Sequence, residues 1–446
     1  MKRIRYRGTS RIAVPAILAL MFVLYWIYVQ WIAPLPFYYQ PDPQMAYLLD
    51  SLSPFKGWGY RNAYHPGVTV CLIGTALYLL SYPFTTGSVD SLILYHLKDP
   101  GVFLAMGRSV LVILYVGTVL LIARFSTRNA AWWESLGGSA IAVVFFLLHG
   151  KAIRTSQVWT QDAFFFPFGT LFLLFVFLIM RDSSGPIRRR RLALMGVGSG
   201  ALLATHLLYA TYVFGIGIAV AIHAALLRSS VRTTGKNLFL FAASVMASFV
   251  VLMLPVASSL SPSMQRWWRL ISTRGRYGGH EPIAPVEQLG ENLAIVSVIP
   301  ELFIGSGVIV LMVAVGLLRK WKVRSLEPGT TAIALGLLVQ LVTAYVVLLV
   351  IKSETNVRYF LVVASMLPIL LAVGLALLAG WGRVSAGLHL VVASVVIPMF
   401  VANMCGAFQV QSRLAHGFEL LEAERDRMMT AYARHIGRTP ESLRIV

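Results

Sequence analysis

The most prominent pattern in the sequence is a series of long hydrophobic stretches separated by short polar segments. A membrane-spanning helix needs about 20 consecutive apolar residues, and backbone groups inside a bilayer must be hydrogen-bonded within the protein. The pattern predicts an all-α integral membrane protein with about eleven transmembrane helices, within a range of 10 to 13. The predicted spans are residues 12–35, 101–123, 136–150, 163–180, 192–205, 207–227, 237–257, 301–318, 330–351, 359–378 and 386–404.

One further hydrophobic stretch, residues 67–83, is short and is interrupted by Thr69, Thr75 and Ser81. If five basic clusters are all cytoplasmic, as the distribution of Lys and Arg in membrane proteins favours, this stretch cannot cross the membrane. It would then be a re-entrant or surface-lying helix on the outer side. If it does cross, one later stretch must fail to cross; we favour the first arrangement. The clusters are residues 3–11, 124–128, 181–191, 228–236 and 319–324.

This arrangement predicts a transmembrane bundle over residues 1–404, with a cytoplasmic N-terminus and no sizeable soluble domain. The external segments are the first loop and three others, namely residues 36–100, 151–162, 258–300 and 352–358.

A C-terminal tail, residues 405–446, follows the bundle. Its charged, helix-prone part places four large apolar residues near one face, so we expect an amphipathic helix that rests on the membrane or on the external loops. The four residues are Leu414, Phe418, Leu421 and Met428.

Composition and charge narrow the choice of partners. The chain is 57% hydrophobic and 13% charged, which is about half the charge of a typical soluble protein, and this excludes a disordered chain. The 38 Lys and Arg exceed the 18 Asp and Glu and give a net charge of +20. Because most of the excess lies in cytoplasmic loops, it indicates a lipid bilayer rather than nucleic acid as partner. Cys71 and Cys405 offer neither a disulfide framework nor a metal-ligand spacing.

Acidic residues lie at the external ends of the spans. Asp42 follows the first span and stands between Pro41 and Pro43, which restrict its backbone. Asp162 begins a very apolar helix. Because Asp is a common helix N-cap, capping is the alternative interpretation for both acids, with Thr160 as a rival at the second position.

Cations and aromatic rings accompany these acids in the first external loop. Arg61, Tyr64 and His65 lie just before the stretch 67–83. A belt of aromatic residues at the membrane surface would account for the tyrosine, but it does not require the arginine or the histidine.

Further candidates follow later in the chain. Lys352, Arg358 and Tyr359 lie at the mouth of a late span, where a cation could reach toward the membrane surface or hold a phosphate. His206 lies at an external turn between two spans, where a histidine satisfied within the bundle is the alternative. Arg276 belongs to a basic, aromatic and glycine-rich loop that could bind an anionic headgroup or a sugar, or form a plain interfacial belt.

The order of these motifs resembles a known family, the polyprenol-phosphate-sugar-dependent glycosyltransferases of the GT-C fold. More narrowly, it resembles the superfamily of protein O-mannosyltransferases and lipid A aminoarabinose transferases. The resemblance covers roughly residues 12–380 and depends on the order of four motifs. These are Asp42 after the first span, His65-Pro66 before an apolar helix, Thr160-Gln161-Asp162 before an apolar run, and Arg358-Tyr359 at the head of a late helix.

The sequence departs from the family pattern at three positions. Pro43 stands where the family has a second acid, Gly67 stands where it has a second proline, and Gln161 separates Thr160 from Asp162.

The resemblance implies an inverting sugar transfer at the outer face of the membrane, from a polyprenyl-phosphate donor to a hydroxyl of a lipid, glycan or protein. It implies that Asp42 takes the acceptor proton and that Asp162 orients the acceptor or the sugar. Arg358 is the first candidate to stabilise the leaving phosphate, and His65 could donate to the phosphate or bind a metal. The remaining candidates for substrate binding are Arg61, Lys352, Tyr64, Tyr359, His206 and Arg276.

Two alternatives without transferase chemistry stay open. A flippase or transporter for a lipid-linked sugar would carry ionisable residues in mid-span, whereas Arg108, the main charge within a span, lies near one end. A scaffold protein would use its external loops as docking surfaces. The sequence identifies no cofactor, and use of a divalent metal stays open. The basic loops indicate a multi-pass protein of a prokaryotic plasma membrane, with the site on the external, periplasmic side.

Overall fold

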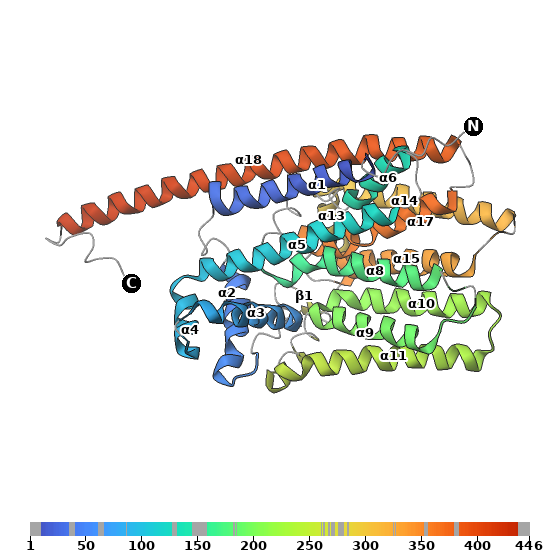
Figure 1. Ribbon diagram of the computed structural model, residues 1–446, viewed down its shortest axis with the longest axis horizontal. Coiled ribbons are helices and arrows are strands. Elements are labelled where there is room, and N and C mark those ends of the chain that lie inside the picture. Colours follow the sequence, from blue (N-terminus) through green and yellow to red (C-terminus); the bar gives the residue numbers. More distant parts are fainter. Residues whose placement is uncertain are drawn as a thin grey trace.

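The computed structural model describes residues 10–34, 41–60, 67–85, 87–126, 132–144, 158–181, 183, 185–259, 261, 264–265, 268, 273–274, 281–282, 285–323, 325, 327–351, 356–378 and 383–435. Nearly all regular structure in these residues is helical (Figure 1), which confirms the all-α class. Two short strands, β1 (Thr273–Arg274) and β2 (Glu281–Pro282), pair antiparallel in the loop 258–300. Helix α13 (Pro285–Val298) follows them.

Nine helical segments of the described residues are long and apolar enough to span a membrane. They are built from α1 (Ser10–Ile27) with the π-helix η1 (Tyr28–Ile32), α5 (Pro100–Ser126), η6 (Gln161–Phe164) with α8 (Phe165–Arg181), η7 (Leu207–Tyr209) with α10 (Ala210–Leu226), α11 (Val231–Met253) with η8 (Leu254–Ser259), α14 (Pro300–Lys322), α15 (Pro328–Val346) with η9 (Val347–Ile351), η10 (Val357–Phe360) with α16 (Leu361–Ala364) and α17 (Leu367–Leu378), and α18 (Arg383–His435).

Two of the predicted spans correspond to helices that are too short to cross a hydrocarbon core. Helix α6 (Trp132–Val143) has 12 residues and α9 (Arg189–Thr205) has 17. At 1.5 Å per residue they are about 18 Å and about 26 Å long, less than the ~30 Å of a hydrocarbon core. The predicted continuation of α6 to residue 150 lies outside the described residues. The count of about eleven spans is therefore not confirmed.

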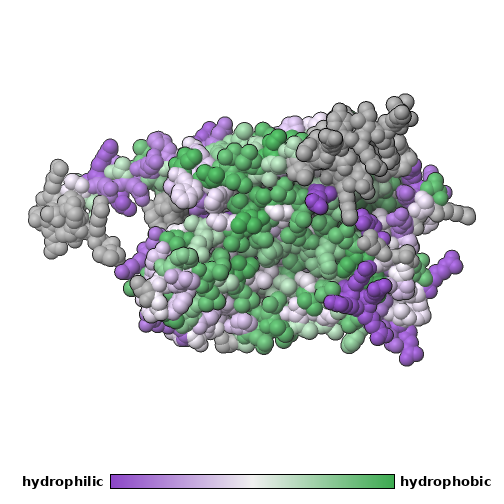
Figure 2. Space-filling view, in the orientation of Figure 1, coloured by the Kyte–Doolittle hydropathy of each residue, from purple (hydrophilic) through white to green (hydrophobic). Residues whose placement is uncertain are grey.

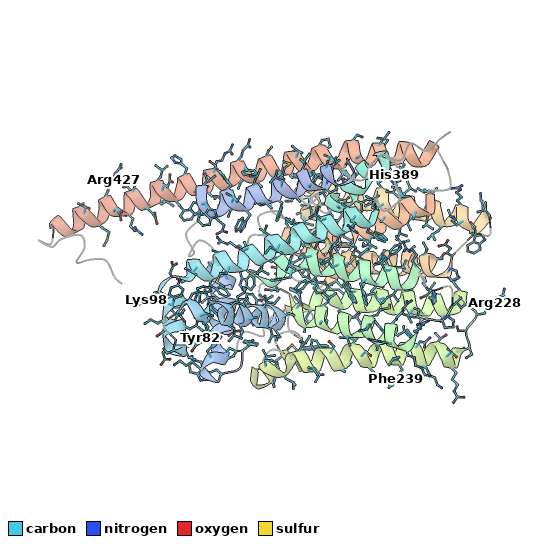
Figure 3. All side chains as sticks on the ribbon, viewed as in Figure 1. Tyr82, Lys98, Arg228, Phe239, His389 and Arg427 are labelled. Carbon is cyan, nitrogen blue, oxygen red and sulfur yellow. The ribbon has the colours of Figure 1, made fainter. Side chains whose placement is uncertain are left out.

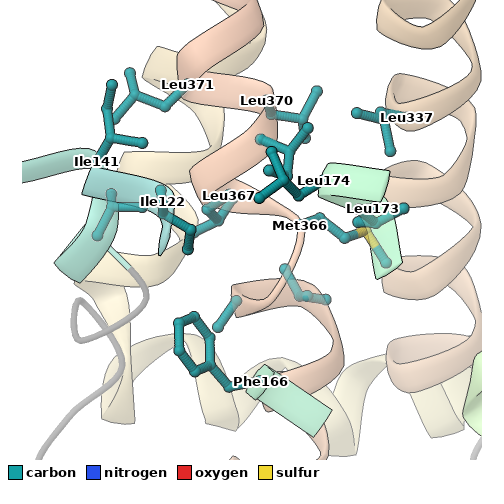
Figure 4. Packing of buried hydrophobic residues seen from close by; sticks show 14 of the residues in the cluster. Ile122, Ile141, Phe166, Leu173, Leu174, Leu337, Met366, Leu367, Leu370 and Leu371 are labelled. Carbon is teal, nitrogen blue, oxygen red and sulfur yellow. The ribbon is translucent and has the colours of Figure 1, made fainter. Parts of the chain in front are cut away.

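The centre of the bundle is formed by α8 and by the segment from η10 to α17. The buried share of the most apolar stretch is 72% in the span Gln161–Arg181 and 89% in Val357–Leu378. In the span Val231–Ala257 it is 22%. Figure 4 shows Leu173 and Leu174 of α8 packed beside Met366 and Leu370. Peripheral spans thus keep much apolar surface outside, and Figure 2 shows hydrophobic residues over the middle of the molecule with hydrophilic residues at its two ends.

Close approach of helices in the bundle depends on glycine. Helices α9 and α11 lie side by side, and a Cβ at Gly196 would lie 2.6 Å from the carbonyl oxygen of Phe241. A Cβ at Gly200 would lie 2.3 Å from that of Val245. Small residues allow this contact between backbones, as is usual in membrane bundles.

The first loop is itself helical, which confirms the expected juxtamembrane helices. It contains α2 (Pro41–Leu52), η3 (Ser53–Lys56), α3 (Val68–Ser81), η4 (Tyr82–Phe84) and α4 (Val89–Lys98). The α3–η4 segment and α4 are bent by 105° relative to each other, as in a broken span or a re-entrant loop. A hydrogen bond of 2.8 Å between Ser81 Oγ and His96 Nε2 joins the two arms. Whether residues 67–83 cross the membrane stays a prediction.

The last helix, α18, runs without a break through the expected boundary between bundle and tail at residue 404. Gln411 Nε2 donates to the carbonyl oxygen of Ala33 at 2.7 Å, so α18 is joined to the end of the first span. Farther along, Arg427 lies beyond the bundle, on the part of α18 that projects to the left in Figures 1 and 3. That this part rests on a membrane or on external loops stays a prediction.

Candidate active site

Asp162 is a buried acid at the start of a central span. It lies in the first turn of η6, and its residue exposure is only 1%. Thr160, not Asp162, is the N-cap residue of this turn, so capping does not explain the acid. Hydroxyl groups of neighbouring helices hold the turn, because Tyr115 donates to the carbonyl oxygen of Ala163 at 2.9 Å and Tyr209 donates to that of Phe165 at 3.1 Å. The carboxylate is thereby fixed inside the bundle rather than in a surface loop.

Arg358 forms an ion pair with this carboxylate. Its Nε lies 3.3 Å from Asp162 Oδ2, and its side chain is 40% exposed. The turn η10 positions the guanidinium, since the Asn356 side chain accepts a hydrogen bond from the Arg358 backbone N–H at 3.3 Å. A terminal nitrogen of Arg358 donates to the Tyr359 hydroxyl at 3.2 Å. One edge of the guanidinium is therefore anchored, while part of the group remains accessible to a ligand.

His206 lies on the other oxygen of the same carboxylate. Its Nε2 is 3.7 Å from Asp162 Oδ1, and its ring packs on Phe165 at a centroid distance of 4.8 Å. The backbone N–H of Leu208 donates to His206 Nδ1 at 3.0 Å. In a neutral imidazole this leaves the proton on Nε2, so the N–H points toward the acid. His206 is thus buried within the bundle and is also part of the site.

Tyr47 and Gln44 of α2 fasten the first loop to the segment that carries Asp162. The Tyr47 hydroxyl donates to Gln161 Oε1, and Gln44 Oε1 accepts from the backbone N–H of Trp159 at 3.1 Å. Burial raises the pKa of Tyr47 well above its usual value, and the negative charges of groups including Cys71 and Asp162 raise it further. The phenol is therefore a hydrogen-bond donor rather than a phenolate.

Asp42 lies in the first turn of the same helix, two residues before Gln44. The position of its side chain lies outside the described part of the structure. Because Gln44 contacts Trp159, the N-terminal turn of α2 lies beside the segment that leads to Asp162.

The other predicted site residues, Arg61, Tyr64, His65, Lys352 and Arg276, lie outside the described residues. His65 and Pro66 immediately precede Gly67 in the sequence. The backbone N–H of Gly67 donates to the carbonyl oxygen of Thr205, the neighbour of His206, at 3.0 Å.

The structure brings together Asp162, Arg358, His206 and Tyr359, which the sequence had selected separately. It adds Tyr47, Gln44 and Gln161, which sequence reasoning missed. Among the described residues, no group of three or more His, Cys, Asp or Glu is arranged to hold a metal ion.

Comparison with known proteins gives a fold but no family assignment. No family model and no curated protein matches the sequence. Among solved structures, ArnT from Cupriavidus metallidurans bound to undecaprenyl phosphate is similar, with a TM-score of 0.50 and 13% identity over 95% of this chain and 81% of that chain. The Archaeoglobus fulgidus oligosaccharyltransferase in complex with zinc and sulfate has a TM-score of 0.49 and 14% identity, over 89% of this chain and 53% of that chain.

At this identity the likeness to ArnT shows the fold alone. The protein has a GT-C-like membrane fold, as the sequence resemblance implied. The buried Asp162–Arg358 pair lies where the first-loop helix α2 meets the central span that begins with η6.

Proposed function

We propose that the protein is a membrane glycosyltransferase. It moves a sugar from a polyprenyl-phosphate donor to a hydroxyl of a lipid, glycan or protein at the outer face of the membrane. The observation that carries this proposal is the buried carboxylate of Asp162, held between Arg358 and His206. ArnT, whose fold is similar, binds undecaprenyl phosphate, which supports a donor of that class.

Arg358 is the residue that meets the donor phosphate. Its Nε faces Asp162, one terminal nitrogen donates to Tyr359, and its side chain is partly exposed. The N–H groups that these two contacts do not use can face phosphate oxygens in a fixed orientation. Charge-assisted hydrogen bonds from guanidinium to phosphate are strong and directional. They stabilise the charge that develops when the bond between the anomeric carbon and the phosphate oxygen breaks.

Asp42 is the base of this proposal, and Asp162 is a positioning residue. Both oxygens of Asp162 already face Arg358 or His206, so this carboxylate orients these two side chains. Asp42 lies on α2, and α2 is tied to the Asp162 segment through Gln44 and Tyr47. It takes the proton from the acceptor hydroxyl as that oxygen attacks the anomeric carbon, and the polyprenyl phosphate leaves from the opposite face of the sugar.

The test is transfer by the purified protein in vesicles that contain undecaprenyl phosphate carrying a radiolabelled hexose or pentose. Membrane vesicles from the cells in which the protein is expressed supply the acceptor. Wild type is expected to release undecaprenyl phosphate and to label the acceptor, whereas Asp42→Asn is expected to abolish both while it remains folded. Asp90→Asn, which changes an acid of the first loop that pairs with Lys56, is the matched control and should transfer normally.

Two outcomes contradict the proposal. Retained transfer by Asp42→Asn would remove the assigned base. Movement of the labelled lipid across the vesicle membrane without any release of undecaprenyl phosphate would favour a flippase instead.

A further inference from the structure

A second cation is buried at the seam between the first span and α5, away from Asp162. Arg108 lies near the start of α5, and its Nη1 donates a long hydrogen bond of 3.5 Å to Gln30 Oε1. Its Nε is buried and has no hydrogen-bond partner. In the part of the chain that the structure describes, no acid forms an ion pair with Arg108. A guanidinium in this situation is costly unless an anion accompanies it.

The groups around Arg108 also lack acceptors. Gln30 Nε2 and Trp26 Nε1 are buried without a hydrogen-bond partner in the described structure. Trp26 precedes Gln30 by one helical turn, so the two lie on the same face of the first span. Gln30 belongs to the π-helix η1, a distortion that is frequent at functional sites. Three buried N–H donors on the first span and α5, together with one positive charge, thus lack a matching acceptor, and a phosphate group would supply one.

An apolar pocket lies farther along the same seam. Its lining includes Leu18 and Phe22 of α1, Tyr115 and Val119 of α5, and Phe400 of α18. Tyr115 follows Arg108 by seven residues, which is about 10 Å along a helix. Hydrophobic side chains beside the seam face outward, since Leu24 is 49% and Ile113 is 69% exposed. A lipid in the bilayer could therefore bring its phosphate to Arg108 while its hydrocarbon chain lies against the apolar side chains along the seam.

This seam is separate from the Asp162 site in its contacts. The hydrogen bond of Arg108 goes to Gln30 on the first span, whereas the ion pair of Arg358 goes to Asp162. Gly107, the residue before Arg108, faces the Trp159 ring, where an added Cβ would lie 2.5 Å from a ring carbon. The backbone of α5 thus presents one residue to the Asp162 segment and the next to the seam.

We propose that Arg108, Gln30 and Trp26 bind the phosphate of an anionic membrane lipid whose chain lies along the seam between α1 and α5. This site is additional to the one at Asp162 and Arg358, and it does not depend on the transferase proposal.

The test is lipid retention, measured by native mass spectrometry after transfer from vesicles of dioleoylphosphatidylcholine that contain a minor fraction of dioleoylphosphatidylglycerol. Wild type is expected to keep one more anionic lipid than Arg108→Met, with an apparent affinity at least about tenfold higher. Arg124→Met, at the other end of α5, is the matched control and should retain the lipid as wild type does. Equal retention by wild type and Arg108→Met would overturn the proposal.

Competition with inorganic phosphate distinguishes a lipid headgroup from free phosphate as the ligand of Arg108. Retention that persists in excess inorganic phosphate supports a lipid, because the chain contributes to binding. Displacement of the lipid by inorganic phosphate would overturn a lipid as the ligand.

Two further variants keep the test decisive if Arg108→Met does not fold. Gln30→Leu combined with Trp26→Phe removes two donors without changing the charge, and Ala19→Phe fills the pocket without touching any donor. Both are expected to lose the additional lipid. Full retention by both would overturn the proposal.

Discussion

The two ends of the bundle use their charged residues in different ways. At the end that carries the first loop, Asp162 is buried between Arg358 and His206. At the other end, the Arg181 guanidinium lies over the rings of Phe125 and Phe177, at 5.5 Å and 5.7 Å from their centroids. Of the acids that the structure describes, the two buried ones, Asp50 and Asp162, both belong to the first end.

The difference has a physical meaning. Burial of a carboxylate costs free energy unless the group is paired and hydrogen-bonded. A buried carboxylate therefore requires charged or polar groups around it. An arginine that packs its apolar stem and stacks on rings at a helix end needs no such arrangement. The comparison supports the proposal that the first end binds substrate, whereas the second end contributes to the stability and orientation of the bundle.

Among the side chains compared between the two ends, the largest expected effect is that of Asp162→Asn, which removes the charge that holds Arg358. We expect sugar transfer to fall by about 10²–10³-fold, the usual result when a group that organises charge stabilisation is lost. The transfer assay with the labelled donor measures this. The double variant Asp162→Asn/Arg358→Gln should transfer sugar no more slowly than the less active of the two single variants. The effects of residues in direct contact are not additive. Fully additive losses would show that the two residues act independently.

The next effect is on stability, at the opposite end of the bundle. A Cβ at Gly329 would lie 1.9 Å from the backbone oxygen of Met180, so Gly329→Ala must push α15 away from the end of α8. We expect a loss of about 1–3 kcal/mol in the free energy of unfolding, seen as a lower thermal midpoint, with unchanged transfer by the folded fraction. Gly235→Ala is the control, since its Cβ would meet nothing within 4 Å. A lower transfer rate in folded Gly329→Ala would break the division between the two ends.

A smaller effect is expected for Tyr47→Phe, which removes the hydrogen bond to Gln161. A typical hydrogen bond contributes about 0.5–1.5 kcal/mol, so transfer should fall by roughly 3–10-fold. Because burial raises the pKa of Tyr47 well above its usual value, the phenol stays protonated at moderately alkaline pH. The alkaline limb of the pH–rate profile should therefore be the same in wild type and in Tyr47→Phe. A shift of that limb in the variant would mean that Tyr47 titrates during the reaction.

The smallest effect is expected for Arg181→Met. Stacking of a cation on a ring near the surface contributes about 0.5–1 kcal/mol, so the thermal midpoint should fall slightly and transfer should not change. A fall in transfer comparable to that of Asp162→Asn would contradict the comparison.

Much of the fold was predictable, because a bilayer imposes length and hydropathy on each helix that crosses it. Nine predicted spans have counterparts among the described helices. The predicted span at residues 192–205 lies within α9, whose 17 residues are fewer than the about 20 that a crossing needs. The helical corner of α3 and α4 depends on tertiary contacts such as Ser81 with His96, which hydropathy does not encode.

The site was predictable where each residue stands at the end of a span. Asp162, His206 and Arg358 were chosen for that reason, and the fold places them together. Tyr47 and Gln44 could not be chosen, because they look like ordinary residues of an amphipathic helix. Their role depends on hydrogen bonds to Gln161 and Trp159, which lie more than a hundred residues later in the chain.

The length of α18 has a practical consequence. Its 53 residues extend over about 80 Å, far more than the ~30 Å hydrocarbon core, and Gln411 binds Ala33 at the end of the first span that leads into the first loop. Residues 419–428, exposed along their whole length, therefore extend beyond Gln411 on the side of the bundle that carries the candidate active site. A single reporter on this rod, such as a cysteine at Glu422 tested with a reagent that does not cross membranes, would read out which compartment the active site faces.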